Sequence, residues 1–479
     1  MAVEFSGERI VQPFFGSSQF VWAILIGLIL LALSLGYAVG GRLADRNPSP
    51  VLLGGVVVGG GLYVALLPLL ARPFLLAVTR GLLASPAGVV LGSLAGVGAL
   101  LVPPVGALGI VSPFAVRLAV TRAEEAGERA GSLYAWSTVG SLAGTFLPTF
   151  WTIPSYGVRD TLYLAGALLI FLGVLMAGRF SLVTALLVPA LMPLDQPPVL
   201  KPVPGLIAEV ETPYQFVQVY RRGRNVYLSV NDAAGFQSVW TPGRLTRLYY
   251  DDYLLLPYAY PRSEPLSALL IGMAGGTIPT LYARDVDPFR APVRMTGVEI
   301  DPGLVRLGES HLHLRPTSAR VAISDGRVFL ETHREAYDLI IVDAYTQEIY
   351  IPFDLTTKEF FALVRAHLAS DGTLAINVNA TSPRAPILLD ILRTLKAVFP
   401  NVRVARAEGT FNYLVAASVS APHLPGPTDV PPFLRGTLER LRSTWHSPRP
   451  GYGLILTDNR APVETLTNQM ILSRLLGRL

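Results

Sequence analysis

Hydrophobic residues are distributed differently in the two halves of the chain. Residues 18–194 hold long uncharged apolar runs, whereas residues 205–479 carry the histidines and strand-like alternation. A helix that crosses a membrane needs about 20 apolar residues. Five runs have this length, at 19–40, 51–71, 86–110, 131–152 and 159–178. A sixth, 181–194, is shorter and interrupted by prolines. Residues 1–194 are therefore expected to form a membrane domain of five to six transmembrane helices.

Arginines between the apolar runs predict the orientation of this domain. Arg42 and Arg46 follow the first run, and Arg117, Arg122 and Arg129 lie between the third and fourth runs. Loops rich in arginine and lysine stay in the cytoplasm. With five spans the chain after 178 is cytoplasmic, whereas a sixth span would place it outside. The ligand expected below requires the cytoplasm, so we expect that 181–194 does not span. The sequence thus predicts a multi-pass protein of the inner (plasma) membrane with a cytoplasmic C-terminal part.

Residues 195–242 have two distinct patterns. The segment 195–205, "DQPPVLKPVPG", is a proline-rich linker. Short alternating segments follow, which predict a small antiparallel β-sheet over 206–242. They are "LIAEVE", "YQFVQVY", "NVYLSV" and "FQSV". The next stretch, "RLTRLYYDDYLLLPY" at 244–258, is expected to be helical.

From residue 266, apolar strands alternate with helical segments. The strands are "LSALLIG", "VRMTGVEI", "ARVAIS", "YDLIIVD" and "GTLAINV". This alternation predicts a Rossmann-like α/β domain with a parallel sheet, covering 243–479. Ligands of such sheets bind beyond the carboxyl ends of the strands. The residues just after each strand are therefore the candidates for a site.

Four consecutive strands end in a glycine loop, a glutamate and two aspartates. The loop begins at Gly272, and the acids are Glu299, Asp325 and Asp343. Asp301, followed by a proline, is expected to cap a helix. Three acids at successive strand ends favour a ligand site, with Gly326 beside Asp325 as part of it.

The loop itself, G-M-A-G-G-T, indicates which ligand to expect. A dinucleotide site requires G-x-G-x-x-G facing a pyrophosphate, and Gly272, Gly275 and Gly276 do not have that spacing. A nucleoside without phosphates fits better, its ribose hydroxyls bound by a carboxylate such as Glu299. S-adenosylmethionine and decarboxylated S-adenosylmethionine are such nucleosides.

The composition of the chain indicates which binding partners to expect. The mean hydropathy is +0.45, which is high for a soluble enzyme and favours a lipid bilayer as a partner. The net charge of +5 comes without a basic cluster, so nucleic acid is not expected. The sequence has no cysteine, which excludes disulfides and zinc–sulfur sites, and no metal is expected.

Several segments together resemble the spermidine synthase family of aminopropyltransferases. They include "VEID", "SDGRVFL", "YDLIIVDAY", "IPFDLTTKEFF" and "LTDNRAPVE". "YAWSTVGSLAGTF" and the first apolar run resemble the branch of that family in which several spans precede the synthase-like domain. In that branch a further helix often precedes "VEFSGERI", whereas this chain starts at Met1. The resemblance covers nearly the whole chain.

The resemblance implies roles for the candidate residues. Glu299 would bind the ribose hydroxyls, and Asp325 would lie near the adenine amino group. Asp343 would be the general base that takes a proton from the attacking amine. Tyr249 would contact the substrate. Gln215 and Gln237 would line the site.

Three positions depart from the pattern of the family. Gly275 stands where the family has an aspartate that holds the aminopropyl amine. Thr346 stands where a second aspartate binds the far end of a diamine, and Tyr250 replaces a histidine or glutamine. The acids expected at the ribose and the adenine are therefore retained, whereas two acids expected to bind amines are replaced.

The leading hypothesis is a membrane-anchored transferase of polyamine biosynthesis. It would move an aminopropyl group from decarboxylated S-adenosylmethionine to a small amine. One alternative is methyl or alkyl transfer from S-adenosylmethionine to a membrane-associated acceptor. Another is a non-catalytic nucleoside-binding membrane protein or transporter, although the spans lack the charged residues expected for cation transport. The resemblance also implies a possible homo-oligomer.

Overall fold

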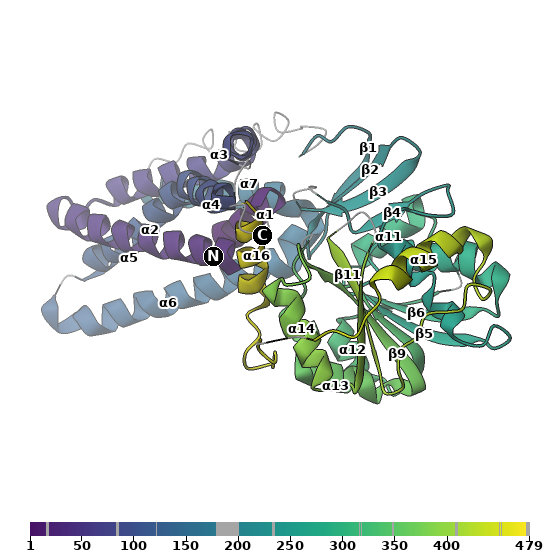
Figure 1. Ribbon diagram of the computed structural model, residues 1–479. Coiled ribbons are helices and arrows are strands. Elements are labelled where there is room, and N and C mark those ends of the chain that lie inside the picture. Colours follow the sequence, from purple (N-terminus) through teal and green to yellow (C-terminus); the bar gives the residue numbers. More distant parts are fainter. Residues whose placement is uncertain are drawn as a thin grey trace. The chain divides into compact units, whose positions relative to one another are not determined.

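The computed structural model describes residues 1–15, 19–82, 86–120, 122–178, 201–231, 235–315, 317, 319–346, 349–407, 411–449, 451 and 453–475. Contacts divide the chain into two compact units, Met1–Pro202 and Val203–Leu479 (Figure 1). The expected segment 181–194 and residues 195–200 of the expected linker lie outside the described residues.

The first unit is helical. Its helices are α1 (Ala2–Phe15), α2 (Gln19–Arg46), α3 (Pro50–Leu82), α4 (Pro86–Leu100), α5 (Val102–Ala119), α6 (Ala126–Leu147) and α7 (Ile153–Met176). Among the described residues, four helical stretches are long and apolar enough to cross a membrane: Val21–Arg46, Pro50–Thr79, Val102–Ala119 and Ala123–Met176. These helices fit the expected multi-span domain. Their insertion into a bilayer stays a prediction.

The fourth stretch contains more than one helix. As a straight helix its 54 residues would measure about 80 Å, against a hydrocarbon core of about 30 Å. A π-helical turn at Pro148–Thr152 and the non-helical Gly157, with φ 83°, interrupt it. Helices α6 and α7 therefore correspond to the separate spans expected at 131–152 and 159–178.

The expected span at 86–110 is wrong. Two helices, α4 and α5, meet there at Leu101, and Pro103 occupies the first turn of α5. A proline in the first turn starts a helix easily, because that position needs no N–H donor. The helix long enough to span is α5, which continues to Ala119. Helix α1, which the hydropathy pattern did not reveal, buries Phe14 and Phe15 among its neighbours.

Glycines bring helices of this unit into close contact. A Cβ atom at Gly54 of α3 would lie 2.4 Å from the carbonyl oxygen of Gly173 in α7. A Cβ atom at Gly36 of α2 would lie 2.3 Å from the carbonyl oxygen of Gly106 in α5. Backbones approach this closely only where side chains are absent.

The second unit starts with the expected small sheet. Its antiparallel strands are β1 (Leu206–Glu211), β2 (Phe216–Arg222), β3 (Asn225–Val230) and β4 (Ser238–Trp240), in the order β1-β2-β3-β4. The long helix expected at 244–258 is wrong. Only α9 (Tyr250–Tyr253) and a 3₁₀ turn at Leu256–Ala259 form there. The Asp251 carboxylate accepts hydrogen bonds from the N–H groups of Thr246 and Arg247, and Arg247 has a positive φ of 60°, so the chain turns instead of coiling.

The large sheet has the order β10-β11-β9-β8-β5-β6-β7. Its strands are β5 (Leu266–Ile271), β6 (Val293–Glu299), β7 (Arg320–Ile323), β8 (Tyr337–Val342), β9 (Leu368–Asn379), β10 (Asn401–Arg406) and β11 (Asn412–Ser418). The five expected strands, β5 to β9, pair in parallel, and β10 and β11 extend the sheet antiparallel. The Rossmann-like fold predicted from the sequence is confirmed.

Helices cover both faces of this sheet (Figure 1). They are α10 (Thr277–Leu281), α11 (Pro302–His311), α12 (Gly326–Thr332), α13 (Lys358–Ala366), α14 (Pro386–Lys396) and α15 (Arg435–Thr444). Helix α16 (Val463–Leu475) packs against α14. Alternate residues of β5 enter two cores: Leu269 and Ile271 pack with α12, α13 and α14, and Ala268 and Leu270 pack with α10 and α15. Such two-sided burial explains why β5 is a continuous apolar run.

Candidate functional site

The candidate site lies where the strand order of the sheet reverses. Strand β6 follows β5 on one side, and β8 pairs with β5 on the other. The crevice beyond such a switch point is where doubly wound sheets bind ligands. The Gly272 loop follows β5 and Asp343 follows β8, so two of the predicted elements lie at this switch point. A Cβ atom at Gly272 would lie 2.6 Å from the Asp343 carbonyl oxygen, which shows how close the two loops are.

Strand β4 of the small sheet holds the glycine loop in place. The Gly275 N–H donates to the Ser238 hydroxyl at 2.9 Å. The Thr277 hydroxyl accepts from the Val239 N–H at 2.8 Å and donates to the Val239 carbonyl at 3.1 Å. Gly276, with φ 83°, ends the loop in a left-handed conformation that suits glycine. The loop is thus fixed by hydrogen bonds between the two sheets.

Gly275 has little room for a side chain. An added Cβ atom would lie 3.1 Å from Leu228 Cδ1 and 3.2 Å from the Cβ and Oγ atoms of Ser238. On the other side, a Cβ atom at Gly308 of α11 would lie 2.5 Å from the Gly275 carbonyl oxygen. The loop is packed between β4 and α11, and the position where the family carries an aspartate is crowded here.

Glu299 ends β6 and is buried, with 6% of its surface exposed. Its Oε2 accepts from the Ala274 N–H at 2.7 Å, and its Oε1 accepts from the Asp301 N–H at 3.0 Å. Burial raises the pKa of this carboxyl above its ordinary value, and the two backbone N–H groups oppose that rise. Glu299 is therefore a rigid acceptor that ties the glycine loop to the start of α11.

Asp301 caps α11, as the sequence predicts. Its Oδ1 accepts from the Gly303 N–H at 2.8 Å. Its Oδ2 accepts from the Thr212 hydroxyl at 2.7 Å and from the Gln215 amide at 3.2 Å. The structure thus places the Gln215 side chain against a helix cap at the edge of the small sheet. Its role as a cofactor ligand stays a prediction.

Asp325 follows β7 and caps α12. Its Oδ1 accepts from the N–H groups of Arg327 and Val328, both at 2.9 Å. Gly326 sits at the first position of that helix, where a Cβ atom would lie 2.3 Å from Ile271 Cγ2 of β5. The cap and the close packing fix Asp325 at the carboxyl end of the sheet. Contact with an adenine ring stays a prediction.

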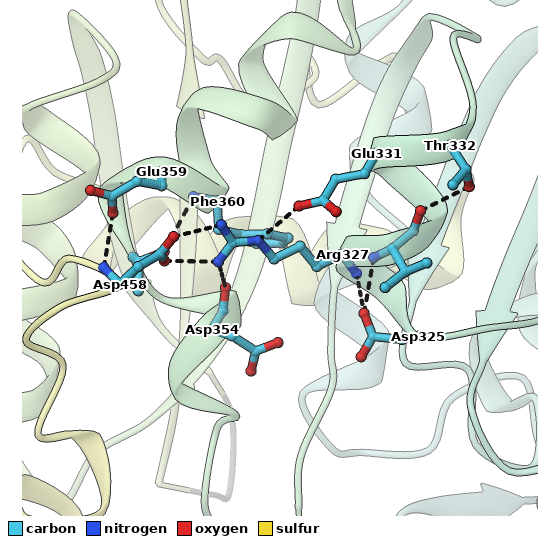
Figure 2. A network of polar contacts seen from close by, with 10 residues as sticks. Asp325, Arg327, Glu331, Thr332, Asp354, Glu359, Phe360 and Asp458 are labelled. Atoms are coloured by element: carbon cyan, nitrogen blue, oxygen red, sulfur yellow. Dashed lines mark hydrogen bonds and ion pairs between the residues drawn. The ribbon is translucent and has the colours of Figure 1, made fainter.

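Arg327 joins three of the segments that resemble the spermidine synthase family (Figure 2). Its guanidinium donates to both oxygens of Asp458, at 2.8 and 2.6 Å. Asp458 Oδ1 also accepts from the hydroxyl of Thr357, which caps α13. "SDGRVFL", "IPFDLTTKEFF" and "LTDNRAPVE" therefore meet in one polar network beside Asp325.

Asp343 lies at the carboxyl end of β8 with neutral polar partners. Its Oδ1 accepts from the Asn377 amide at 2.8 Å. The Tyr249 hydroxyl lies 3.4 Å from Oδ1 and 3.2 Å from Oδ2 and donates to the carboxylate. Burial raises the pKa of Asp343 to about 6, and the hydrogen bonds from Asn377 and Tyr249 limit the rise. A carboxylate with this pKa is mostly ionised at neutral pH and can accept a proton.

Tyrosines surround this carboxylate. The rings of Tyr249 and Tyr250 stack at 4.1 Å, and Tyr253 lies edge-on to Tyr249 at 6.2 Å. Burial, with the charge of Asp343, raises the pKa of each of these tyrosines and of Tyr345. All four are thus neutral at physiological pH. Aromatic faces beside a carboxylate suit an amine, through charge and cation–π attraction.

Gln237 connects the tyrosines to the small sheet. Its backbone carbonyl accepts from the Tyr250 hydroxyl at 3.0 Å, and its side-chain Oε1 accepts from the Val230 N–H at 3.0 Å. The structure thus brings Gln237, Tyr249, Tyr250 and Asp343 together. A direct role of the Gln237 side chain in ligand binding stays a prediction.

Sequence reasoning missed three polar residues of the site: Ser238, Asn377 and Asn412. Ser238 holds the glycine loop, and Asn377 donates to Asp343. Asn412 donates to Asn377 Oδ1 at 2.8 Å. A polar residue near the carboxyl end of an apolar strand was the available signal for Asn377. Within the part of the chain that the structure describes, no group of three His, Asp or Glu side chains could hold a metal ion.

Comparison with known proteins relates this geometry to one family. Residues 268–408 match the family profile of the spermine/spermidine synthase domain. This part of the chain is similar to that family, and we refer to it as the spermidine synthase-like domain. It contains the glycine loop, Glu299, Asp325 and Asp343, which all lie at or just after the carboxyl ends of strands of the large sheet.

Relatives of the spermidine synthase-like domain include transferases of two kinds. The chain is 35% identical over 206 residues to the probable polyamine aminopropyl transferase of Bifidobacterium longum, covering 43% of this chain and 44% of that protein. It is 30% identical over 181 residues to the polyamine aminopropyltransferase of Oceanobacillus iheyensis, covering 36% and 33%. It is 33% identical over 156 residues to the N-terminal histidine N-methyltransferase of Emericella nidulans, covering 31% and 26%. The chain spans less than half the length of each of these relatives.

Proposed function

We propose that the spermidine synthase-like domain transfers an aminopropyl group from decarboxylated S-adenosylmethionine to a small amine. The observation that supports this most directly is the position of Asp343, at the switch point of the sheet, beside the Gly272 loop and next to Tyr249. The similarity to the aminopropyltransferases of Bifidobacterium longum and Oceanobacillus iheyensis supports the same reaction.

The proposed chemistry needs one base and one fixed geometry. The lone pair of the amine nitrogen attacks the propyl carbon bonded to the sulfonium. The new C–N bond forms as the C–S bond breaks, and sulfur keeps the electron pair, which leaves neutral methylthioadenosine. The nitrogen then carries a positive charge, and Asp343 takes its proton. Since sulfonium is already a good leaving group, the protein contributes mainly alignment and this proton transfer.

The nucleoside would lie over the carboxyl ends of β5, β6 and β7. The loop from Gly272 to Gly276 lets its backbone approach the nucleoside closely. Glu299 would accept from the ribose hydroxyls with the lone pairs that its two backbone donors leave, and Asp325 with Gly326 would border the adenine. Gln215 and Gln237 would hold the walls of this half of the site in place, through the hydrogen bonds that they make to Asp301 and to the Val230 N–H.

A second candidate reaction is methyl or alkyl transfer from S-adenosylmethionine. Crowding at Gly275 favours it, because a carboxylate that could bind the aminopropyl amine does not fit there without displacing Ser238 or Leu228. The similarity to an N-methyltransferase favours it too. The two reactions share the fold and Asp343, and they differ in the group transferred.

We further propose that helices α2 to α7 anchor this activity in the plasma membrane, with the spermidine synthase-like domain on the cytoplasmic side. Four stretches of suitable length and composition and the arginines of the connecting loops support this. Protease protection of the domain in right-side-out and inverted vesicles tests it. Digestion from the outer face of right-side-out vesicles would refute the orientation. Crosslinking in the same vesicles reports whether the chain forms a homo-oligomer.

Calorimetry on the purified full chain tests the ligand. The proposal expects binding of decarboxylated S-adenosylmethionine and of methylthioadenosine, and weaker binding of S-adenosylmethionine. Tighter binding of S-adenosylmethionine would favour the methyl-transfer candidate. If none of the three nucleosides bound, both reactions would be excluded. Glu299→Gln is expected to weaken binding of all three, because it replaces a carboxylate acceptor by a poorer one.

A further inference from the structure

Two buried asparagines connect Asp343 to the antiparallel edge of the sheet. Asn377 lies on β9 and is 3% exposed, and Asn412 starts β11 and is 8% exposed. The Asn412 amide donates to Asn377 Oδ1 at 2.8 Å, and the Asn377 amide donates to Asp343 Oδ1 at 2.8 Å. Buried amides in cores normally pair with backbone or water, so two side-chain amides in series that end on a carboxylate call for an explanation.

Chemistry dictates the orientation of both amides. An ionised carboxylate can only accept hydrogen bonds, so Asn377 must turn its NH₂ group toward Asp343. Its carbonyl oxygen then points away and requires a donor, which Asn412 provides with its own NH₂ group. Reversing either amide would place two acceptors or two donors against each other. Only one orientation of the two amides therefore lets every donor among Asn412, Asn377 and Asp343 face an acceptor.

The scaffold around the asparagines is rigid. Strands β9 and β11 pair antiparallel over Thr373–Asn379. The Tyr345 hydroxyl donates to the Asn377 carbonyl at 2.9 Å and accepts from the Asn379 N–H at 3.0 Å. This clamp joins the loop after Asp343 to the strand that carries Asn377. Side chains held on strands are placed more accurately than side chains on loops.

We propose that Asn412 and Asn377 form a two-amide relay that holds Oδ1 of Asp343, and that Oδ2, which accepts from the Tyr249 hydroxyl, takes the proton on its second lone pair. Both asparagines are positioning residues: Asn377 acts through Asp343, and Asn412 acts through Asn377. That the proton comes from an acceptor amine rests on the proposed function. The relay itself does not.

The relay predicts how Asp343 titrates. The groups that face its carboxylate are Asn377 from β9, Tyr249, Tyr250 and Tyr253 from the segment at α9, and Tyr345 from its own loop. Since the pKa of each of these tyrosines is raised, they stay neutral while Asp343 titrates. Asn377 is thus a main donor that favours the ionised form. Removing its N–H should raise the pKa of Asp343 by about one unit, the size expected for one hydrogen bond to a charged group.

Infrared titration of the full chain in detergent tests the relay without requiring turnover. The C=O stretch of protonated Asp343 is identified as the band lost in Asp343→Asn, and its pH midpoint is followed in the variants. Asn377→Leu should raise the midpoint by about one unit, and Asn412→Leu should raise it by less. In the double variant the midpoint should equal that of Asn377→Leu, because Asn412 has no path to Asp343 without Asn377. Asn401→Leu, which removes an amide that donates to the Val419 carbonyl, is the matched control and should leave the midpoint unchanged.

Two results would overturn the relay. One is an unchanged or lowered midpoint in Asn377→Leu. The other is an equal effect of Asn412→Leu with and without Asn377, which would indicate a general effect on packing. If Asn377→Leu does not fold, an unchanged midpoint in Asn412→Leu refutes the relay by itself. If the titrations confirm the relay but the protein forms no aminopropyl product, the proposed function is refuted and the relay is not.

Discussion

Adding a methyl group at Gly272 should separate the loops that follow β5 and β8. A Cβ atom there would lie 2.5 Å from Ala344 Cα, 2.6 Å from the Asp343 carbonyl oxygen and 2.7 Å from the Ala344 nitrogen. Non-bonded carbon atoms prefer about 3.5–4.0 Å, so the loops must part by about 1 Å. They cannot part freely, because the Asp343 N–H donates to the Ile271 carbonyl at 2.9 Å.

Gly272→Ala therefore carries two costs of different kinds. The positive φ of 83° costs an alanine about 1–2 kcal/mol of folding free energy. The displacement of Asp343 relative to the glycine loop acts on the reaction, since an error of about 1 Å in alignment can lower a rate by about 100-fold. We expect a loss of kcat/KM of about that size, measured as methylthioadenosine release from decarboxylated S-adenosylmethionine.

Gly223→Ala separates the two costs. Gly223 also has a positive φ, 61°, in the turn between β2 and β3, and a Cβ atom there meets nothing within 4 Å. Because an alanine at this positive φ is also strained, Gly223→Ala should lose a similar amount of thermal stability. It should keep its activity. If Gly272→Ala kept activity within a few-fold of Gly223→Ala, the inference that the two loops set the geometry of the site would be wrong.

Three further variants test other parts of the account. Asp458→Asn should lower the free energy of unfolding by about 1 kcal/mol, because the bidentate ion pair with Arg327 is partly exposed, and by less at high salt. An equal loss of stability at low and high salt, measured by thermal unfolding, would contradict a role of the ion pair. Burial raises the pKa of Asp343 to about 6, so the folded state loses stability as the pH rises from about 4 to 6. The free energy of unfolding of Asp343→Asn should therefore exceed that of the wild type by up to about 3 kcal/mol at pH 8, and by little at pH 4. Hydrogen exchange of β8 checks this, and a gain that is equal at both pH values would refute it. Ser238→Ala removes the acceptor of the Gly275 N–H and should weaken nucleoside binding about 10-fold in calorimetry, the equivalent of about 1.4 kcal/mol.

The strands of the site were predictable because their signal is local. Each of β5 to β9 contains a short apolar run, and in a parallel sheet the residue after each strand must reach the same edge. Glu299, Asp325 and Asp343 follow from that rule alone. Asp301 as a helix cap was also predictable, because an aspartate followed by a proline starts a helix.

Other features depend on contacts between distant segments. Asn377 and Asn412 come together only because β11 pairs antiparallel with β9, and Ser238 reaches Gly275 from another sheet. The helix expected at 244–258 fails because Asp251 bonds back to the N–H groups of Thr246 and Arg247, a local competition that apolar periodicity does not reveal.

The most direct test of the central claim is identification of the group transferred. The purified full chain is incubated with decarboxylated S-adenosylmethionine and a set of small amines, and the products are identified by mass spectrometry beside an Asp343→Asn control. The account predicts equal amounts of methylthioadenosine and an aminopropylated amine, with a large loss of both in Asp343→Asn. Binding of the nucleoside without either product, or undiminished turnover by Asp343→Asn, would contradict it.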